Sequence, residues 1–356
     1  MNFSRNTYLE VDLNKIKNNV KKIINNYSEY KYYFGVVKAN CYGCDNDSLE
    51  VTKAIIDAGC NYLAVATLEE AIKIRKKIKD IPILVLGHVN KDFIKEAIKN
   101  EITITIHSIE TLNEIINQKL EGLKVHIKIN TGMNRLGINK NLKKLYDKCV
   151  ENDIYVEGIY THIYNASNEN DYNNQISLFE DLLKEIDISK VPIIHIAASD
   201  ALTNYKKVKE ANGCRLGIIM YGFSKKINLE SPIKLYSEII QINNLKKGEV
   251  VGYNGAFKAN KDTKIGVVPI GYADGIIRKN TGRFVYINEK QYRIVGNVCM
   301  DMMFVEIDNN IKLYDKVEIL KDNEHIEEVA KYLDSIPYEI LCEISNRVPR
   351  IYKKIK

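Results

Sequence analysis

The first residues of the chain alternate between apolar and polar side chains and then change to a helical period. Apolar residues occupy every second position from Leu9 to Leu13, with Glu10 and Asp12 between them. From Leu13 to Tyr27 the apolar positions recur at intervals of three and four residues. This change of period predicts a strand followed by an amphipathic helix.

After this opening, apolar runs of strand length alternate with segments of helical period. The strand-like runs cover residues 32–38, 62–67, 81–86, 102–106, 125–129, 154–160, 192–197 and 215–221. The helix-like segments between them cover residues 48–58, 68–78, 91–99, 109–119, 142–152, 172–186 and 201–210. Eight apolar strands separated by helices predict a (β/α)8 TIM barrel, with a doubly wound open sheet as the alternative.

From about Ser231 the helical period largely disappears. Short strand-like runs cover residues 248–251, 264–270, 284–287, 292–298, 302–307 and 316–319, and one short helix is expected at 326–333. The fold class is therefore α/β, with an N-terminal barrel domain over residues 1–230 and a C-terminal mostly-β domain over residues 231–356. The first strand, about residues 8–13, could pair with the C-terminal domain instead of the barrel.

Composition narrows the class of protein. The 356 residues are 45% hydrophobic, which suffices for a large core, and no apolar run is long enough to span a bilayer. Residues 1–22 mix polar and apolar side chains, unlike a secretory signal, and the seven cysteines are irregularly spaced. We expect a cytoplasmic protein with reduced thiols. The net charge of +6 is spread over helix-like segments, so we expect neither a nucleic acid nor a membrane as a partner.

A lysine follows the first barrel strand. In the stretch Phe34 to Gly43, an apolar run ends at Lys38 and is followed by turn residues. A barrel places its catalytic groups at the carboxyl ends of its strands, and an amine held there among apolar neighbours can act as a Schiff-base nucleophile. The alternative is an edge-strand lysine whose ammonium group reaches water.

Other polar residues follow the later strands. They are Tyr42 after the first strand, Lys128 and Arg135 around the end of the fifth, His162 after the sixth and Ser199 after the seventh. Arg215 instead stands at the start of the expected eighth strand. The hydroxyl of Ser199 and the backbone N–H groups of Gly217 and Ile218 could hold a phosphate, although Ser199 by itself is more typical of a helix cap.

Several motifs in register resemble the alanine racemase family, the fold type III enzymes that depend on pyridoxal 5′-phosphate. The matching segments are Val36 to Gly43, Asn130 to Gly137, Arg215 to Gly222, Gly271 to Gly275, Cys299 to Asp301 and Arg347 to Arg350. They extend from the first barrel strand almost to the C-terminus. Any one of these motifs is a weak signal, whereas their ordered combination is specific.

The resemblance implies a homodimer with shared active sites, in which residues 1–230 bind pyridoxal 5′-phosphate. Lys38 would hold the cofactor covalently. Tyr42, Ser199, Gly217 and Ile218 map to the phosphate ligands, Arg215 to the donor facing the pyridine nitrogen, and His162 to its neighbour. Arg135 maps to a residue beside the cofactor that also binds the substrate carboxylate, and Met300 to a second carboxylate contact. Lys128 matches a position that is carbamylated in some members.

The implied reaction is the interconversion of L- and D-alanine, with serine as a further or even the main substrate in an alanine/serine branch. Racemisation needs acid/base groups on both faces of the substrate. Lys38 is one, and Tyr272 of the partner subunit is the other. Because a phenol in water ionises only near pH 10, His162, Arg135 or Arg215 must ease its ionisation. D-alanine biosynthesis for the cell wall is the pathway associated with the family; the sequence leaves the pathway open.

Arg215 bears on the reaction type. An arginine cannot protonate the pyridine nitrogen as a carboxylic acid can, which weakens the electron sink and favours fast return of the proton. This argues against transamination and against the fold-related decarboxylases, which are the alternative enzyme class. A catalytically silent cofactor-binding barrel is a third possibility, and the intact Tyr272 loop argues against it.

Two segments depart from the family pattern. Asn346 stands where a tyrosine is common, and its smaller amide could accommodate and hydrogen-bond a substrate hydroxyl, so we expect serine to be accepted. Cys41 and Cys44 flank Tyr42 in the lysine motif. We interpret them as packing thiols, although their oxidation could perturb the cofactor site. No spacing typical of a metal site occurs, and no metal is expected.

Overall fold

The computed structural model describes residues 4–354, which form two compact units. The unit that we call the barrel unit contains residues 17–41 and 52–229. The unit that we call the β unit contains the chain up to Ile16, residues 42–51 and the chain from Glu230 onward. The chain therefore passes between the units within the lysine motif.

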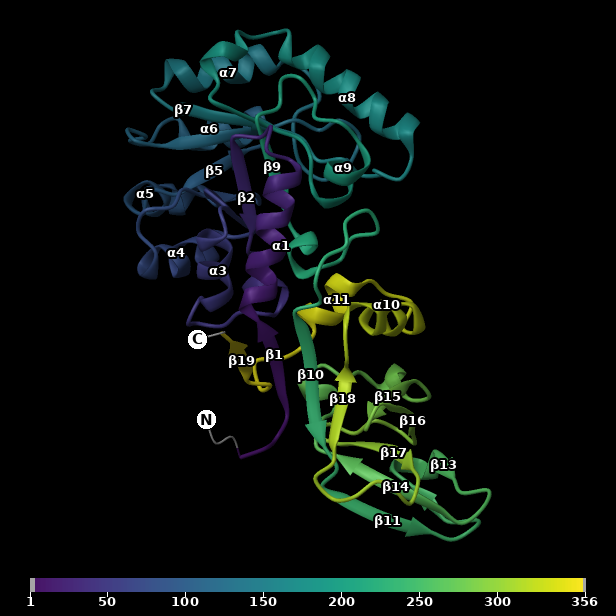
Figure 1. Cartoon of the computed structure of the whole chain (residues 1–356). Coiled ribbons are helices and arrows are strands. Elements are labelled where there is room, and N and C mark those ends of the chain that lie inside the picture. The colour runs from purple at the N-terminus through teal and green to yellow at the C-terminus, as the bar shows by residue number, and fades with distance from the viewer. Residues whose placement is uncertain (1–3, 355–356) are drawn as a thin grey trace. The chain divides into compact units, whose positions relative to one another are not determined.

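The barrel unit is a closed ring of eight parallel strands with helices outside it (Figure 1). The strands are β2 (Tyr32–Val36), β3 (Tyr62–Val65), β4 (Ile83–Val85), β5 (Thr103–Ile106), β6 (Lys124–Lys128), β7 (Tyr155–Tyr160), β8 (Ile193–His195) and β9 (Gly213–Leu216). The helices around them are α3 (Glu50–Asp57), α4 (Leu68–Lys77), α5 (Ile94–Lys99), α6 (Ile109–Ile115), α7 (Leu142–Glu151), α8 (Glu169–Leu183) and α9 (Ser199–Asn204). The barrel prediction is confirmed.

The last barrel strand was predicted too late in the chain. The strand expected at residues 215–221 is β9, which ends at Leu216, and the apolar residues after it form the 3-10 turn η3 (Ile218–Tyr221). All four residues of η3 are buried, so a continuous apolar run could not separate the strand from the turn. As a result, Arg215 lies near the carboxyl end of its strand.

Aromatic and imidazole rings fill the barrel interior. Phe34 on β2 stacks on Tyr62 of β3 and His195 of β8, with ring centroids 4.4 and 4.5 Å apart. Tyr160 on β7 stacks on the other side of His195 at 4.6 Å, and the rings of His126 and His195 are 5.1 Å apart. Some of these side chains come from strands that are not neighbours, so they meet across the interior of the barrel. The interior therefore carries polar atoms as well as apolar area.

The β unit is built on a nine-stranded sheet in the order β11-β14-β17-β16-β15-β18-β10-β1-β19. Its strands are β1 (Tyr8–Asp12), β10 (Ile233–Glu238), β11 (Gln241–Leu245), β14 (Thr263–Val268), β15 (Phe284–Ile287), β16 (Lys290–Val295), β17 (Met303–Ile307), β18 (Lys316–Leu320) and β19 (Arg350–Lys353). A separate hairpin pairs β12 (Val250–Val251) with β13 (Phe257–Lys258). The first strand pairs antiparallel with β10 and parallel with β19, within this unit.

Besides the seven helices named above, the structure has α1, α2 (Lys38–Tyr42), α10 and α11. Helix α1 (Leu13–Asn26) follows β1 as expected, and α10 (Asn323–Tyr332) matches the helix expected at 326–333. Helix α11 (Pro337–Cys342) was not predicted, because six residues are too few to show a period. Within residues 4–354, no helix combines the length and the apolar character needed to cross a membrane.

Candidate active site

The predicted nucleophile stands at a strained turn. Lys38 lies two residues beyond the end of β2, and the four residues from Ala39 to Tyr42 all have φ between 51° and 57°. The backbone N–H of Ala39 donates to Glu70 Oε1 at 2.6 Å. A left-handed conformation costs a residue with a Cβ about 1–2 kcal/mol, and such strain persists mainly at functional sites. The turn directs the chain away from β2 immediately after Lys38.

Arg215 is a buried cation whose terminal nitrogens are occupied by neutral acceptors. Nη1 donates to Nδ1 of His195 at 2.7 Å, and Nη2 donates to the carbonyls of Thr161 and Ile196, both at 2.8 Å. Nη2 also lies 3.2 Å from Nδ1 of His162. Burial lowers the pKa of Arg215 to about 10. Among residues 4–354 none of these contacts uses Nε. The Nε–H group is therefore the donor available to a ligand.

The contact with His195 continues across the barrel. Nε2 of His195 lies 2.9 Å from Nδ1 of His126, and Nε2 of His126 lies 3.4 Å from Oε2 of Glu157. A guanidinium can only donate, so Nδ1 of His195 accepts and Nε2 of His195 carries its proton. By the same argument His126 carries its proton on Nε2. All donors in the series Arg215, His195, His126 thus point toward the Glu157 carboxylate.

Glu157 ends this series as an anion. Its Oε2 also accepts hydrogen bonds from the hydroxyl of Tyr62 at 2.6 Å and from that of Thr103 at 2.9 Å. Burial opposes ionisation, but the close approach of His126 Nε2 and the hydrogen bonds from Tyr62 and Thr103 outweigh it and lower the pKa of Glu157 to about 2. Burial lowers the pKa of both histidines, so they remain neutral.

Further basic groups cluster beside Arg215 at the ends of β6 and β7. Lys128 Nζ lies 5.6 Å from the ring centroid of Tyr160, and Cζ of Arg215 lies 5.4 Å from it. Burial, followed by the charges of Arg135 and Arg215, lowers the pKa of Lys128 to about 8. Burial and the same two arginines lower the pKa of His162 to about 3. His162 is therefore neutral and accepts from Arg215.

Arg135 lies on the loop that follows β6. The side-chain oxygen of Asn130 accepts from the N–H of Gly132 at 3.1 Å and from that of Asn134 at 2.9 Å, which folds the loop back on itself. Gly137 has φ of +123°, and a Cβ there would lie 2.7 Å from the backbone nitrogen of Asn130. The loop thus has a defined shape, and it leaves Arg135 exposed.

The predicted phosphate ligands follow the adjacent strands β8 and β9. Helix α9 begins at Ser199 itself, and its N-cap, Ala198, makes no side-chain capping bond. The interpretation of Ser199 as a cap is therefore wrong. Gly217 is the N-cap of η3 and Ile218 is its first residue. The first N–H groups of a helical turn have no acceptor within that turn, so both turns offer donors to an anion.

Tyr272 and Met300 belong to the β unit. Tyr272 opens the 3-10 turn η5 (Tyr272–Asp274), and its backbone N–H donates to the carbonyl of Cys299 at 3.0 Å. The N–H of Ala273 donates to the carbonyl of Met300 at 3.0 Å. The Tyr272 side chain is 43% exposed and that of Met300 is 53% exposed. Two adjoining loops therefore present both side chains to the outside of this unit.

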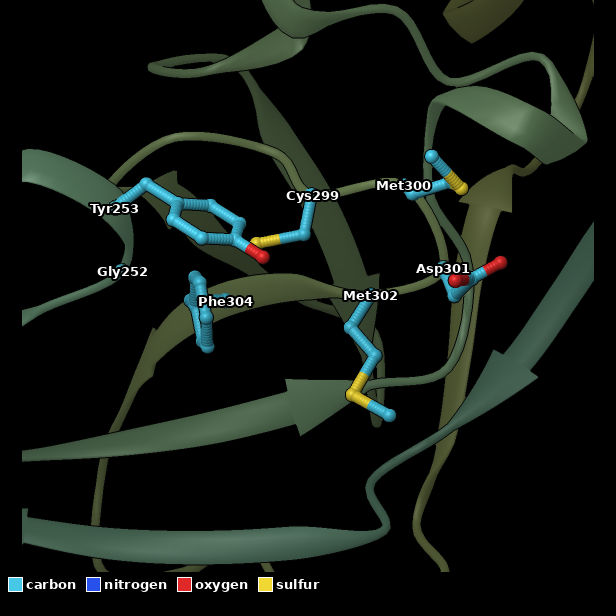
Figure 2. A pocket seen from close by; sticks show the side chains of 7 residues that line it. All are labelled: Gly252, Tyr253, Cys299, Met300, Asp301, Met302 and Phe304. Carbon is cyan, nitrogen blue, oxygen red and sulfur yellow. The ribbon is translucent and has the colours of Figure 1, made fainter.

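Beside Met300 the β unit has a pocket of about 410 Å³. Figure 2 shows its lining residues, which are Gly252, Tyr253, Cys299, Met300, Asp301, Met302 and Phe304. Tyr253 is 71% exposed in the unit. The lining is mostly apolar, with Asp301 at one edge.

Tyr42 and Asn346 also belong to the β unit. The ring of Tyr42 lies 5.8 Å from that of Tyr338, and the next residue, Gly43, accepts from Nε of Arg350 at 2.9 Å. Asn346 is exposed on the turn before β19. The predicted site residues are thus divided between the units, with the barrel unit carrying eight of them: Lys38, Lys128, Arg135, His162, Ser199, Arg215, Gly217 and Ile218.

The cysteine pair behaves as packing thiols. Cys41 and Cys44 are both buried and form no disulfide, and burial raises the pKa of Cys44. The Cys41 thiol lies 3.3 Å from the hydroxyl of Thr52. Over the described part of the chain, no group of three histidine, cysteine or acidic side chains is arranged to hold a metal ion.

Family models cover both units of the chain. The model described as "Alanine racemase, N-terminal domain" matches residues 11–225, and the one described as "Alanine racemase, C-terminal domain" matches residues 233–352. The chain belongs to the alanine racemase family. It is therefore an enzyme of the isomerase class.

Relatives named as alanine racemases match nearly the whole chain. Alanine racemase 1 of Bacillus subtilis is 36% identical over 98% of this chain and 94% of its own length. The alanine racemase of Methanococcus maripaludis is 35% identical over 97% of this chain and 98% of its own length. Similarity of this extent indicates that the fold is shared along the full length.

Solved structures of alanine racemases are similarly close. That of alanine racemase from Bacillus anthracis, determined with bound L-Ala-P, has a TM-score of 0.92 at 33% identity and covers 99% of this chain and 96% of its own. The histidine racemase of Leuconostoc mesenteroides has a TM-score of 0.89 at 24% identity, which shows a common fold alone.

Three polar residues of the barrel interior were missed by the sequence reasoning. His126, His195 and Glu157 lie within strands, whereas the predicted site residues were taken from the segments that follow strand ends. A signal was present, because His126 stands between Val125 and Ile127 and the second histidine between two isoleucines. A polar side chain inside a parallel strand that is otherwise apolar indicates a buried polar network.

Proposed function

We propose that this protein interconverts L- and D-alanine with pyridoxal 5′-phosphate as its cofactor, and that it also accepts serine. The observation that carries the proposal is Arg215, a buried arginine whose Nη groups are occupied and whose Nε–H remains available. It stands at the same end of the barrel as Lys38. Membership in the alanine racemase family supports the same reaction.

The residues present fit this cofactor. When bound, the cofactor supplies an electron-withdrawing ring that makes the α-hydrogen of an attached amino acid acidic. Lys38 would hold it covalently, Arg215 would donate to its ring nitrogen, and His162 and Arg135 would lie beside the ring. Two helical turns with free first N–H groups suit its phosphate, which would be bound by Ser199, Gly217, Ile218 and Tyr42.

Racemisation requires acid/base groups on both faces of the substrate, and we assign these roles to Lys38 and to Tyr272 of the partner subunit. In this arrangement the protein is a homodimer and each subunit completes the other's site. Tyr272 and Met300 are exposed on the β unit, and Met300 lines a mostly apolar pocket, which is the placement expected of residues that reach another subunit. The substrate carboxylate would be bound by Arg135 of one subunit together with Met300 of the partner subunit.

Lys128 is a candidate for carbamylation. Its pKa of about 8 leaves an appreciable fraction of neutral amine near physiological pH, and only the neutral amine can add carbon dioxide. Carbamylation would replace a buried cation by an anion close to Arg135 and Arg215. It would thereby reduce the repulsion within a cluster of like charges.

The proposal has two alternatives. In the first, serine is the main substrate, because the amide of Asn346 offers donors and an acceptor to a hydroxyl. In the second, the protein is a decarboxylase of similar architecture. Arg215 counts against the second, because a guanidinium can donate a hydrogen bond to the ring nitrogen but cannot protonate it as a carboxylic acid can.

The test is incubation of the cofactor-loaded protein with L-alanine and with L-serine, separately, in deuterated water. Loss of the α-proton signal and appearance of the D enantiomer would support racemisation, and the ratio of the two rates gives the preferred substrate. Release of carbon dioxide from a basic amino acid, without α-proton exchange of alanine or serine, would contradict the proposal and support the decarboxylase alternative.

A further inference from the structure

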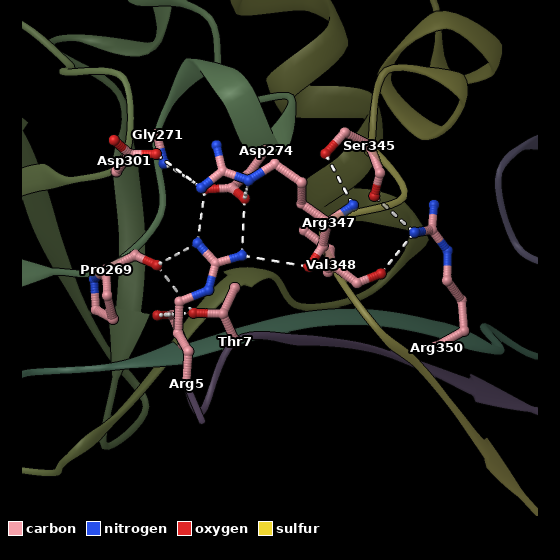
Figure 3. Close-up of polar contacts among 11 residues, drawn as sticks. Arg5, Thr7, Pro269, Gly271, Asp274, Asp301, Ser345, Arg347, Val348 and Arg350 are labelled. Atoms are coloured by element: carbon pink, nitrogen blue, oxygen red, sulfur yellow. Dashed lines mark hydrogen bonds and ion pairs between the residues drawn. The ribbon is translucent and has the colours of Figure 1, made fainter. Parts of the chain in front are cut away.

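The turn that carries Tyr272 is held by an ion pair between the N-terminal segment and a buried carboxylate. Asp274, which is fully buried, receives two parallel hydrogen bonds from Arg5 (Figure 3). Nη1 of Arg5 lies 2.9 Å from Oδ2, and Nη2 lies 2.8 Å from Oδ1. A bidentate pairing of this kind is both stronger and geometrically more restrictive than a single contact.

The same carboxylate organises the turn itself. Oδ2 of Asp274 accepts from the backbone N–H of Gly271 at 3.0 Å, directly before Tyr272. The backbone carbonyl of Asp274 accepts from the N–H of Ser345 at 3.1 Å. Asp274 therefore fixes both ends of the turn η5, and the position of the Tyr272 side chain depends on it.

A second arginine joins this turn to the Met300 loop. Nε of Arg347 lies 3.8 Å from Oδ1 of Asp274, and its Nη2 lies 2.7 Å from Oδ1 of Asp301 (Figure 3). The two loops also approach very closely, because a Cβ on Gly271 would lie 2.3 Å from the carbonyl oxygen of Cys299. A shift of Asp274 would therefore change the position of the Tyr272 turn relative to Met300.

Arg5 is well anchored for this role. Its Nη1 also donates to the carbonyl of Pro269 at 3.2 Å, which in turn accepts from the hydroxyl of Thr7 at 3.0 Å. Thr7 directly precedes β1, and that strand pairs with both β10 and β19. The sheet thus holds the N-terminal segment in place, and the segment supplies the main counter-charge of Asp274.

We propose that Arg5 is a positioning residue for proton transfer: through Asp274 it holds Tyr272 at the place from which it acts in the partner's site. The inference rests on the proposed role of Tyr272 and goes beyond it, because Arg5 itself touches neither substrate nor cofactor. Misplacement of an acid/base group by about 1 Å can lower a rate by on the order of a hundredfold.

The first variants are Arg5→Met and Arg5→Lys, each measured as the complete, cofactor-loaded protein. Arg5→Met leaves the buried carboxylate without its main partner, whereas lysine keeps the charge but loses the planar pairing. We expect Arg5→Met to lower kcat by on the order of 10–100-fold with little change in KM for alanine, and Arg5→Lys to lie between it and the unchanged protein. Asp262→Asn, which breaks the exposed pair between Lys246 and Asp262, is the matched control and should leave both constants unchanged.

Two further readouts separate positioning from a loss of stability. In the cofactor-free protein, hydrogen exchange at the amides of Tyr272 and Ala273 should accelerate in Arg5→Met while the strands of the sheet keep their protection. With α-deuterated L- and D-alanine, the isotope effects of Arg5→Met should change in the same direction as those of Tyr272→Phe. The double variant Arg5→Met/Asp274→Asn should have a kcat only slightly below that of either single variant.

The outcomes are distinct. Lower stability with unchanged loop exchange and unchanged isotope effects would overturn the inference and leave Arg5 a structural residue. If Arg5→Met does not fold, the same three measurements on Arg5→Lys decide the question. Full activity of Tyr272→Phe would instead overturn the proposed role of Tyr272, whatever the Arg5 variants show.

Discussion

Nη1 of Arg215 donates to Nδ1 of His195 over 2.7 Å, at the bottom of the candidate site. This one contact fixes which nitrogen of His195 carries the proton, because an arginine offers no acceptor. The same constraint passes through His126 to Glu157. The buried positive charge of Arg215 is therefore balanced across two neutral imidazole rings by a carboxylate.

Glu157→Gln is expected to destabilise the barrel at neutral pH. The pKa of Glu157 falls from 4.5 to about 2 on folding, and each pKa unit corresponds to about 1.4 kcal/mol, so loss of the charge should cost on the order of 3 kcal/mol. The pKa is lower in the folded state, so this stability is present above about pH 4.5 and is lost as the pH falls toward 2. The measurement is urea unfolding of both proteins at pH 7 and pH 3.

The control for this prediction is Glu151→Gln, at an exposed position at the end of α7. It should leave the free energy of unfolding nearly unchanged at both pH values. The difference in the free energy of unfolding between Glu157→Gln and the unchanged protein should become smaller at the lower pH. If it stays the same, the carboxylate is not the source of the stability.

Lys128 should bind carbon dioxide reversibly. Native mass spectrometry in bicarbonate buffer should show one added carbon dioxide per subunit, and Lys128→Arg should lack it. Because the pKa of Lys128 is about 8, the neutral amine becomes abundant as the pH rises through that value, so occupancy should increase between pH 6.5 and pH 8.5. Equal masses with and without bicarbonate at pH 8.5 would refute the assignment.

Subunit mixing should restore activity to two inactive variants. Lys38→Ala and Tyr272→Phe each remove one of the two proposed acid/base groups, but a hybrid dimer with shared sites contains one complete pair. After random exchange the activity should reach roughly a quarter of that of the unchanged protein. Subunit exchange is verified with a mass-labelled chain. Verified hybrids without activity would mean that both groups act within one chain.

Asn346→Tyr should reduce the acceptance of serine more than that of alanine. Tyrosine removes the amide donors and adds bulk, so the ratio of kcat/KM for serine to that for alanine should fall on the order of tenfold. The two constants are measured on the same preparation. Asn346→Ser, which keeps a small polar side chain, is the comparison variant and should retain most of the serine activity. An unchanged ratio in Asn346→Tyr would remove this residue from the account of specificity.

Local patterns were sufficient to predict the barrel and most of the residues at its mouth. The strands β2 to β8 lie where the apolar runs indicate them, because each is buried on both faces and bounded by polar turns. Lys38, His162 and Ser199 follow their strands as predicted. Arg215 was predicted at the wrong end of its strand, because the buried turn η3 continues the apolar run.

What the sequence determined by itself is the order of elements and the identity of the motif residues, because both depend on neighbours within a few positions along the chain. Only the tertiary structure decided which distant groups pair. Arg5 and Asp274 are separated by 269 positions, and His126 and His195 by 69. Such pairs form when burial leaves a charge or a ring nitrogen that must find a partner, and the fold alone brings that partner within reach.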